Sequence, residues 1–285
     1  MTSSKVIAVD LDGTLTLTDT LHESVLTLVR NNPFMIFLLP FWLIRGVAHL
    51  KSKVEENSVL DVTTLPFNKP FIDWLKEQKV EGKKLVLCTA SNVRIAQAVH
   101  EHLDFFDDVI ASDAYTNLKS SRKRNALQEK YGELGYDYAG NSSADLKVWA
   151  GASQAIVVNA NKRVLKKASQ VASISETFPS ENPSALDWLR ALRLHQWLKN
   201  LLLFVPLLAS HQLDNIQSIA TSIVALISYS LCASSVYIIN DLFDLESDRN
   251  HPRKKQRPFA SGKLPIKLGV AVAPLLIILS IILAA

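Results

Sequence analysis

Residues 5–15 read KVIAVDLDGTL, and this stretch decides the fold of the first part of the chain. An apolar, β-branched run that ends in acids and glycine is typical of a buried parallel strand. Asp10 and Asp12 are two positions apart, so both carboxylates point to the same side at the end of that strand, before the turn at Gly13. We therefore expect a polar site at this edge of a sheet.

Three further apolar runs follow, at residues 84–88, 137–139 and 155–158, with helical patterns at about 93–103 and 123–131 between them. This alternation predicts an α/β, doubly wound, Rossmann-like domain whose site lies at the strand ends. Polar residues come directly after the second and third runs: Thr89, Ser91, Gly140, Asn141 and Asp145.

These motifs together resemble those of the haloacid dehalogenase-like phosphatase superfamily over about residues 5–165. The resemblance implies that Asp10 is a nucleophile forming an aspartyl-phosphate and that Asp12 is the general acid and base. Thr89 would hydrogen-bond the phosphoryl group, and a lysine would offset its charge, with Lys123 the first candidate and Lys119 the second. The implied Mg²⁺ ligands are Asp10, Asp12 and Asp145, and the candidate substrate-binding residues are Ser91, Lys119 and Asn141.

One position departs from that family. Its members commonly have Gly-Asp where this chain has Gly140 followed by Asn141, so the site lacks one negative charge and is expected to bind Mg²⁺ less tightly. Two interpretations therefore stay open for the domain, which we assign to residues 1–167. It is either an active phosphatase or a catalytically silent regulatory or docking module.

The connection between the first two motifs is too long for a plain loop and is expected to form a small helical cap over about residues 17–68. It contains an apolar stretch, residues 34–44, which is interrupted by Pro40 and flanked by Arg30 and Arg45. That stretch is too short to cross a bilayer. Contact between the cap and a membrane surface is a hypothesis that follows from its apolar character.

The second part of the chain has the composition of a membrane segment. Between Lys199 and Asp241 the only formally charged residue is Asp214, and residues 268–285 carry none. After a linker at 168–185, we expect an all-α transmembrane domain over 186–285. It would contain three helices of a larger bundle, at about 186–209, 216–248 and 265–285. Basic residues before the first helix and after the second predict a multi-pass protein of the inner or plasma membrane, with its N-terminal domain in the cytoplasm.

Residues 240–248 read NDLFDLESD and follow directly on the uncharged run 216–239. If the helix continues, four oxygen-bearing side chains fall within about 100° of one another on one face, and Glu246 points away. Such hard oxygen ligands suit Mg²⁺ bound to a phosphate-bearing substrate, although a solvated helix end is the alternative. The four candidate metal ligands are Asn240, Asp241, Asp244 and Asp248.

Basic residues surround this acidic stretch. Together with the His-Pro and Arg-Pro-x-Ala-Ser-Gly elements of residues 251–262, the acidic spacing resembles the UbiA-type intramembrane prenyltransferase superfamily. Residues 193–200, which read RLHQWLKN, look most like its decaprenyl-phosphate phosphoribosyltransferase branch; ordinary membrane-interface anchors are the alternative. The resemblance implies Mg²⁺, a diphosphate and these substrate-binding residues: Arg193, Lys199, Asn200, Lys255 and Arg257.

The function expected from both resemblances is a membrane-bound transferase fused to a Mg²⁺-dependent phosphatase. Its substrates would be phosphoribosyl pyrophosphate and a polyprenyl phosphate, and the phosphatase would act on the lipid-linked product. An aromatic prenyltransferase using a polyprenyl diphosphate and an aromatic acceptor is the alternative. These transferases have a second Asp-rich motif that this sequence lacks, so we expect the transferase part to be incomplete and inactive as given. A net charge of +4 without an aromatic and basic array argues against nucleic-acid binding, and two cysteines predict no disulfide framework.

Overall fold

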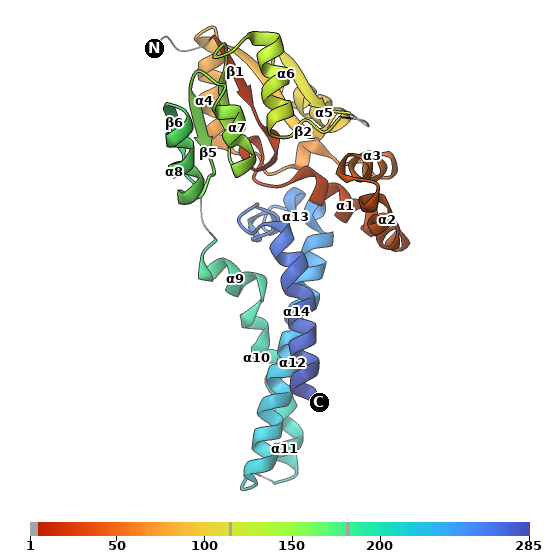
Figure 1. Ribbon diagram of the computed structural model, residues 1–285. Coiled ribbons are helices and arrows are strands. Elements are labelled where there is room, and N and C mark those ends of the chain that lie inside the picture. Colours follow the sequence, from red (N-terminus) through yellow and green to blue (C-terminus); the bar gives the residue numbers. More distant parts are fainter. Residues whose placement is uncertain (1–4, 114–115, 181–182, 212) are drawn as a thin grey trace. The chain divides into compact units, whose positions relative to one another are not determined.

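The computed structural model describes residues 5–113, 116–180, 183–211 and 213–285. The chain divides into two compact units, Met1–Glu181 and Asn182–Ala285, called unit 1 and unit 2 below. Unit 1 contains a sheet with helices on both sides, whereas unit 2 is helical (Figure 1).

Unit 1 is built on a six-stranded, fully parallel sheet in the order β3-β2-β1-β4-β5-β6. Strand β1 lies between β2 and β4, and the winding of the chain reverses there, which is where such sheets place their sites. The doubly wound α/β prediction is therefore confirmed. The strands are β1 (Val6–Val9), β2 (Lys84–Asn92), β3 (Asp108–Ser112), β4 (Asp137–Gly140), β5 (Ala155–Val158) and β6 (Ile174–Phe178).

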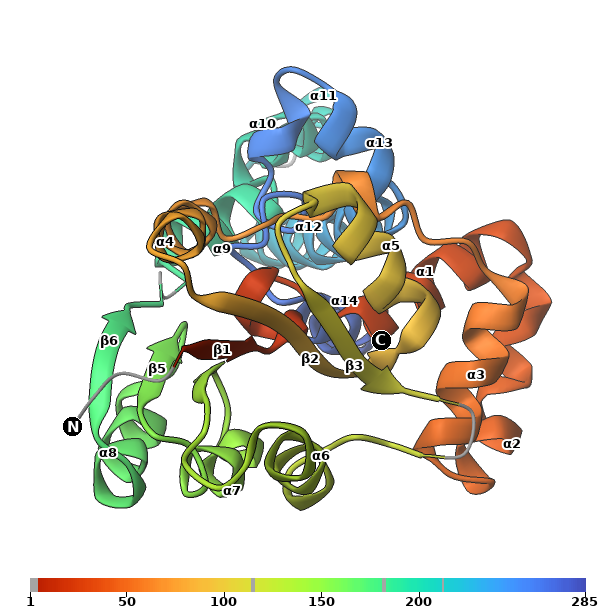
Figure 2. The ribbon, with the colours of Figure 1, turned by 90° about the horizontal axis from the view of Figure 1, so that it is seen from above.

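Helices cover both faces of this sheet (Figure 2). On one face α4 (Lys69–Val80) and α5 (Val93–Leu103) bury apolar side chains against it, and on the other α6 (Ser121–Tyr131), α7 (Leu146–Trp149) and α8 (Lys162–Val171) do the same. Because β1 is buried on both faces, its run of apolar residues is nearly continuous.

Two strands were missed from the sequence, β3 and β6, and both lie at the edges of the sheet. Strand β6 exposes Ser175, Glu176 and Thr177, so it lacks the apolar run of a central strand. It occupies part of the predicted linker at 168–185, as does the end of α8. The linker prediction is therefore wrong for residues 168–178, because an edge strand with polar residues reads like a loop.

Helices fill the region between β1 and α4 that was predicted to form a cap. They are α1 (Thr20–Asn31), the 3-10 helix η2 (Pro33–Phe37), α2 (Leu39–Ile44), α3 (Val47–Asn57) and the short turn η3 (Val62–Thr64). The side chain of Asp19 caps α1 by accepting hydrogen bonds from the backbone N–H groups of Leu21 and His22. Helix α3 packs against both α1 and α2, so these elements form one small group.

Among its described residues, unit 2 contains two helices that are long and apolar enough to cross a membrane, α12 (Ile216–Phe243) and α14 (Ile266–Ala284). The predicted helix at 186–209 is not continuous. It is broken into α9 (Ala185–Ala191), α10 (Trp197–Asn200) and α11 (Val205–Ala209), with 3-10 turns between them. Arg193 adopts a left-handed conformation with φ 52°, and Pro206 has no N–H to continue a helical ladder.

The predicted helix at 216–248 is also interrupted. Asp244 ends α12 with φ −96° and ψ 9°, and α13 (Leu245–Asn250) begins after it. The bend is small, because the Asp244 N–H still donates to the Asn240 carbonyl at 2.9 Å and the Asp248 N–H donates to the Asp244 carbonyl at 2.7 Å. The prediction of one uninterrupted helix over 216–248 is therefore wrong at Asp244, although the hydrogen-bond ladder continues across the break.

Small and hydroxylated side chains hold α12 against α14. Ser228 and Ser280 donate to each other's backbone carbonyl, both at 2.8 Å, and Ser235 donates to the Ala273 carbonyl at 2.8 Å. A Cβ at Gly269 would lie 2.8 Å from the Phe259 ring, so glycine is needed for this close approach. Such contacts are typical of helices packed in an apolar medium.

Candidate functional sites

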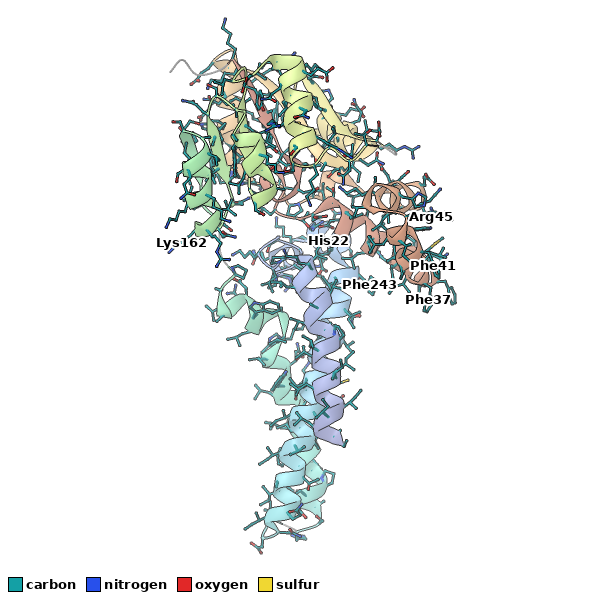
Figure 3. All side chains as sticks on the ribbon, in the orientation of Figure 1. His22, Phe37, Phe41, Arg45, Lys162 and Phe243 are labelled. Carbon is teal, nitrogen blue, oxygen red and sulfur yellow. The ribbon has the colours of Figure 1, made fainter. Side chains whose placement is uncertain are left out.

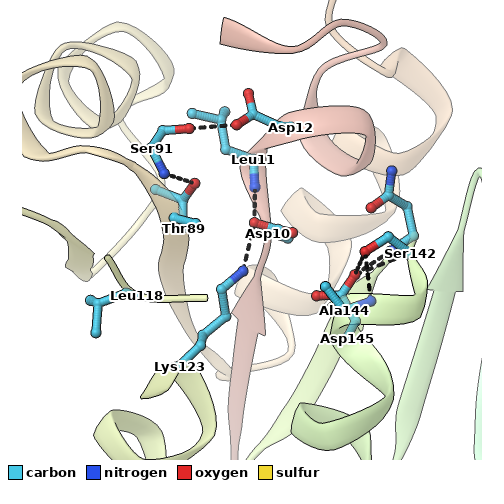
Figure 4. A network of polar contacts seen from close by, with 12 residues as sticks. Asp10, Leu11, Asp12, Thr89, Ser91, Leu118, Lys123, Ser142, Ala144 and Asp145 are labelled. Atoms are coloured by element: carbon cyan, nitrogen blue, oxygen red, sulfur yellow. Dashed lines mark hydrogen bonds and ion pairs between the residues drawn. The ribbon is translucent and has the colours of Figure 1, made fainter. Parts of the chain in front are cut away.

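The first candidate site lies where β1 ends, at the reversal point of the sheet (Figure 4). Asp10 follows β1, and its Oδ1 accepts a hydrogen bond from the Leu11 N–H at 2.9 Å and one from Lys123 Nζ at 2.8 Å. Lys123 lies in α6, which covers one face of the sheet, and its side chain is only 3% exposed. Lys119, the second candidate, is exposed. The structure thus brings the first-choice lysine to the predicted nucleophile.

Burial and the charge of the partner side chain act in opposite directions on the pKa of Asp10 and on that of Lys123. Burial raises the pKa of Asp10 to about 7, although Lys123 acts to lower it. Burial acts to lower the pKa of Lys123, but the nearby carboxylates of Asp10 and Asp145 outweigh it and raise that pKa instead. The lysine is therefore fully charged at neutral pH, while the Asp10 carboxylate still lacks part of the stabilisation that it had in water.

Lys123 also links Asp10 to the strand end of β4. Its Nζ donates to the Tyr138 hydroxyl at 2.8 Å, and that hydroxyl donates to Asp145 Oδ1 at 3.0 Å. The other oxygen of Asp145 accepts from Ser142 through both its N–H and its Oγ, each at 2.9 Å. Tyr138 was missed from the sequence, because inside an apolar strand a tyrosine reads as a core residue.

Asp12 is held by the start of the cap and by β2. Its Oδ1 accepts from the Thr20 N–H at 2.8 Å, and its Oδ2 accepts from Ser91 Oγ at 2.5 Å. The Ser91 N–H donates to Thr89 Oγ1 at 3.0 Å, so the two predicted hydroxyl residues are joined at the end of β2 and Ser91 contacts Asp12. Burial also raises the pKa of Asp12, which favours a carboxyl that can hold a proton.

Asn141 lies directly over the turn that follows Asp12. Gly13 has φ 72°, and a Cβ built on it would lie 2.0 Å from Asn141 Nδ2. The backbone N–H of Asn141 donates to Asp145 Oδ2 at 3.2 Å. Asn141, the asparagine that stands where the haloacid dehalogenase-like pattern commonly has aspartate, thus lies between Gly13 and Asp145.

A small, shallow pocket opens between the cap and β2. Lys51 of α3 reaches across it and donates to the Ala90 carbonyl at 2.6 Å. Glu55, one turn further along α3, also lines this pocket, and burial raises its pKa to about 7. Neither residue was singled out from the sequence. The lining residues are Thr20, Leu21, Ser24, Lys51, Val54, Glu55, Ser91, Asn92 and Ile95.

The second candidate site is in unit 2, at the end of α12. Oδ1 of Asp241 accepts from the guanidinium of Arg193 at 2.6 Å and from that of Arg257 at 3.1 Å. Arg257 also donates to Asp248 Oδ2 at 2.7 Å, so one guanidinium bridges the two carboxylates. Arg193 additionally stacks on Tyr237, with its guanidinium carbon 4.6 Å from the ring centroid.

The other residues predicted for this site lie apart from the pair Asp241 and Asp248. Asn240, Lys199 and Lys255 are exposed, and Asp244 is half-buried without a side-chain partner among the described residues. Asn200 donates to Ser230 Oγ at 2.8 Å instead, which fastens α10 to α12. Lys254, which was not predicted, has its Nζ 3.7 Å from Asp248 Oδ1.

Neither site shows a preformed metal cage. Within the described ranges, no three His, Cys, Asp or Glu side chains are gathered closely enough to hold a metal ion together. Each site nevertheless supplies hard carboxylate oxygens, and Asp248 Oδ1 is buried without a hydrogen-bond partner in the part of the chain described. This donor set fits Mg²⁺ bound by a few carboxylates together with substrate phosphates and water, rather than by protein alone.

Unit 2 is similar in sequence to known transferases. Residues 201–285 match the model of the UbiA prenyltransferase family. The chain is 35% identical to the uncharacterized protein y4nM of Sinorhizobium fredii over 91% of this chain and 50% of that protein. It is 39% identical to a decaprenyl-phosphate phosphoribosyltransferase of Corynebacterium glutamicum over 33% of this chain and 29% of that protein. The Mycobacterium tuberculosis protein of the same name is 37% identical over 36% of each chain.

The chain thus spans half the length of the Sinorhizobium relative and about a third of the transferases that it matches. Among solved structures, a HAD family hydrolase from Salmonella enterica matches 62% of this chain and 67% of its own, with 12% identity and a TM-score of 0.46. A phosphoserine phosphatase in its apo form matches 66% of this chain and 98% of its own, with 16% identity and a TM-score of 0.46.

Proposed function

We propose that unit 1 is a phosphatase that cleaves phosphate monoesters through Asp10. The observation that carries this proposal is the contact at 2.8 Å between Lys123 Nζ and Asp10 Oδ1 at the reversal point of the sheet. A buried lysine there offsets the charge of an incoming phosphoryl group and fixes the carboxylate that attacks it. The hydroxyl residues Thr89 and Ser91 on the neighbouring strand end support the same assignment.

The reaction follows from the positions of the two acids. A carboxylate oxygen of Asp10 attacks the phosphorus, the ester P–O bond breaks, and the leaving oxygen takes a proton from Asp12. Asp12, now ionised, removes a proton from a water molecule, which attacks the phosphorus of the aspartyl-phosphate. Phosphate leaves and the Asp10 carboxylate is restored. The raised pKa of Asp12 suits its first role as an acid.

We propose that Mg²⁺ binds beside these acids, held by Asp10, Asp12 and Asp145 with Asn141 close by. When bound, it neutralises charge on the carboxylates and on the phosphoryl oxygens. The carboxylate oxygens at the strand ends fit such an ion, and the amide of Asn141 provides an oxygen without the charge of an aspartate.

We propose that unit 2 belongs to a membrane transferase whose leaving group is a Mg²⁺-bound diphosphate. The family match over residues 201–285 and the pairing of Asp241 and Asp248 with two arginines support this. Asp241 and Asp248 would hold the cation, and Arg193 and Arg257 would move to the phosphate oxygens. The names of the transferase relatives favour phosphoribosyl pyrophosphate as donor and a polyprenyl phosphate as acceptor.

Fusion of the two units suggests a sequence of reactions. Transfer of a phosphoribosyl group to a lipid phosphate leaves a phosphate monoester on the sugar, and that monoester is a substrate for unit 1. We propose that the chain lies in the inner or plasma membrane and crosses it more than once. Basic residues after α12 favour a cytoplasmic position for unit 1.

The test uses the full chain in detergent with Mg²⁺. Release of p-nitrophenol from p-nitrophenyl phosphate is expected from the wild type and not from the Asp10→Asn variant. Activity that survives the substitution would remove Asp10 as the nucleophile. Absence of activity in both proteins would favour the silent module instead.

A separate binding measurement addresses unit 2. Mg²⁺-dependent binding of phosphoribosyl pyrophosphate, lost in Asp248→Asn, is expected from isothermal titration calorimetry. Binding of a polyprenyl diphosphate in place of the sugar diphosphate would instead favour an aromatic prenyltransferase.

A further inference from the structure

The cap of unit 1 carries an apolar surface that its own fold does not cover. None of the residues in η2 and α2, from Pro33 to Ile44, is buried. Phe34 is 79% exposed, Phe37 69%, Phe41 66% and Ile44 83%. We call the exposed side chains of residues 33–44 the apolar cap face. Figure 3 shows Phe37 and Phe41 pointing away from the rest of unit 1, with Arg45 beside them.

This surface is held out by a fixed scaffold. Helix α2 packs against α3, and η2 contacts α1. The Asn32 side chain caps η2 by accepting a hydrogen bond from the Phe34 N–H at 3.2 Å. Soluble monomers rarely expose a continuous patch of so many large apolar side chains. A folded element that presents its apolar residues outward is therefore built to contact something apolar.

The charge around the apolar cap face identifies the partner. No acidic residue occurs between Glu23 and Glu55, whereas Arg30 and Arg45 flank the apolar stretch. An apolar centre with a basic border matches an anionic lipid surface, where the apolar groups enter the acyl region and the cations meet the headgroups. A protein partner would require no such one-sided charge.

The second unit of the chain indicates which apolar phase lies near the apolar cap face. Unit 1 is covalently joined to a segment with two helices of membrane-spanning length, α12 and α14. If these helices span a bilayer, unit 1 is held near its lipid surface by the covalent link to unit 2. We propose that the apolar cap face inserts into the boundary between headgroups and acyl chains of that bilayer.

Membrane contact through the apolar cap face would affect access to the candidate site of unit 1. The same cap that carries it also holds the candidate site, because Thr20 at the start of α1 donates to Asp12 and Lys51 of α3 donates to the Ala90 carbonyl. Insertion of the face would bring the mouth of the pocket between α3 and β2 close to the lipid headgroups. A phosphate ester carried by a lipid could then reach the site without leaving the membrane. The membrane contact itself does not depend on the proposed function.

The test places a fluorescent probe on the face in the full chain, reconstituted into vesicles that contain phosphatidylglycerol. Cys232 is replaced by serine, whereas Cys88 is fully buried and needs no replacement. Phe37→Cys is labelled with the environment-sensitive NBD fluorophore. Val80→Cys, at a residue that is 88% exposed and lies outside the apolar cap face, is the matched control.

The probe at residue 37 is expected to emit at shorter wavelength and to be quenched by lipids with bromine or nitroxide labels on their acyl chains. The probe at residue 80 is expected to show neither effect. Adding Phe41→Glu to the Phe37→Cys protein should weaken the quenching without lowering the unfolding temperature, because Phe41 is not part of a core. Replacing phosphatidylglycerol by zwitterionic lipid should also weaken it.

Two results would overturn the proposal. In the first, the probe at residue 37 behaves like the probe at residue 80, which means that the face stays in water. In the second, its emission shifts to shorter wavelength but lipid quenchers have no effect, which means that protein, such as a second copy of this chain, covers the face instead.

Discussion

The ammonium nitrogen of Lys123 lies 2.8 Å from Oδ1 of Asp10, and the two side chains are 3% and 13% exposed. A buried ion pair of this kind joins α6 to the end of β1 across the reversal point of the sheet. It also places a fixed positive charge beside the carboxylate that we propose as nucleophile. Stability and activity should therefore both depend on this contact.

Lys123→Met should lower phosphatase activity by at least ~100-fold, because the phosphoryl group loses the cation that faces it. At about pH 8 it should also destabilise unit 1 by on the order of 3 kcal/mol, since the buried Asp10 carboxyl loses the cation that offsets its burial. Burial raises the pKa of Asp10 to about 7 with Lys123 in place, and removing Lys123 raises that pKa further. The loss should therefore be smaller at about pH 5, where Asp10 is protonated in both proteins. Thermal unfolding at both pH values measures this. The double variant Asp10→Asn and Lys123→Met is the control and should recover most of the stability.

Gly13→Ala should abolish activity, because residue 13 has φ 72° and the added Cβ would lie 2.0 Å from Asn141 Nδ2. The positive φ and the clash together should destabilise unit 1 by roughly 1–3 kcal/mol. Adding Asn141→Ala removes the clash but not the strain, so the double variant should be more stable than Gly13→Ala alone. Equal stability of the two proteins would mean that Asn141 does not lie over Gly13.

Glu55 gives a dependence of stability on pH. Burial raises its pKa from 4.5 to about 7, so the folded chain keeps a proton that the unfolded chain has already lost. Stability should therefore fall as the pH rises from about 4.5 to about 7. In Glu55→Gln the free energy of unfolding should fall by on the order of 1 kcal/mol less than in the wild type over this pH range, which corresponds to ~3 °C in unfolding temperature. Glu56→Gln is the matched control, because Glu56 is exposed and its pKa is lowered by Lys53. An unchanged slope in Glu55→Gln would contradict the assignment.

In unit 2, Arg257 is the residue to test and Lys255, two positions away, is its control. Arg257 bridges Asp241 and Asp248, whereas Lys255 is exposed. Arg257→Gln should weaken Mg²⁺-dependent binding of phosphoribosyl pyrophosphate by on the order of 100-fold, because a guanidinium is lost from the site and a buried carboxylate loses its partner. Lys255→Gln should change the affinity by less than ~3-fold. Equal losses in calorimetry would mean that the loop adopts another arrangement when the diphosphate binds.

The strand ends of unit 1 were predictable from the sequence because central parallel strands carry a strong signal. β1 and β4 are buried on both faces, so their apolar runs and the polar residues that follow them are visible in the sequence. Lys123 could be chosen over Lys119 because it falls within a helical pattern. The edge strands β3 and β6 have only one neighbouring strand each and are partly exposed, so their signal is weak.

The site in unit 2 was less predictable, because it depends on where a helix bends. A continuous helix would align Asn240 with Asp241, Asp244 and Asp248, but α12 ends at Asp244, and Asn240 is exposed whereas Asp241 and Asp248 are buried. The choice between Arg257 and Lys255 depends on the turn after His251, whose Nδ1 accepts hydrogen bonds from the backbone N–H groups of Arg253 and Lys254. The course of such a turn cannot be read from a run of basic residues.

The measurement that tests the central claim most directly is the mass of the peptide that contains Asp10. The Asp12→Asn protein is mixed with p-nitrophenyl phosphate and Mg²⁺ and then quenched in acid, because without its base this variant should accumulate the aspartyl-phosphate. The leaving group of this ester needs no proton, so the first step still proceeds. We predict that the peptide gains the mass of one phosphoryl group on Asp10 and that Asp10→Asn abolishes the gain. A burst of p-nitrophenol without any phosphorylated Asp10, or a phosphoryl group on another residue, would contradict the account.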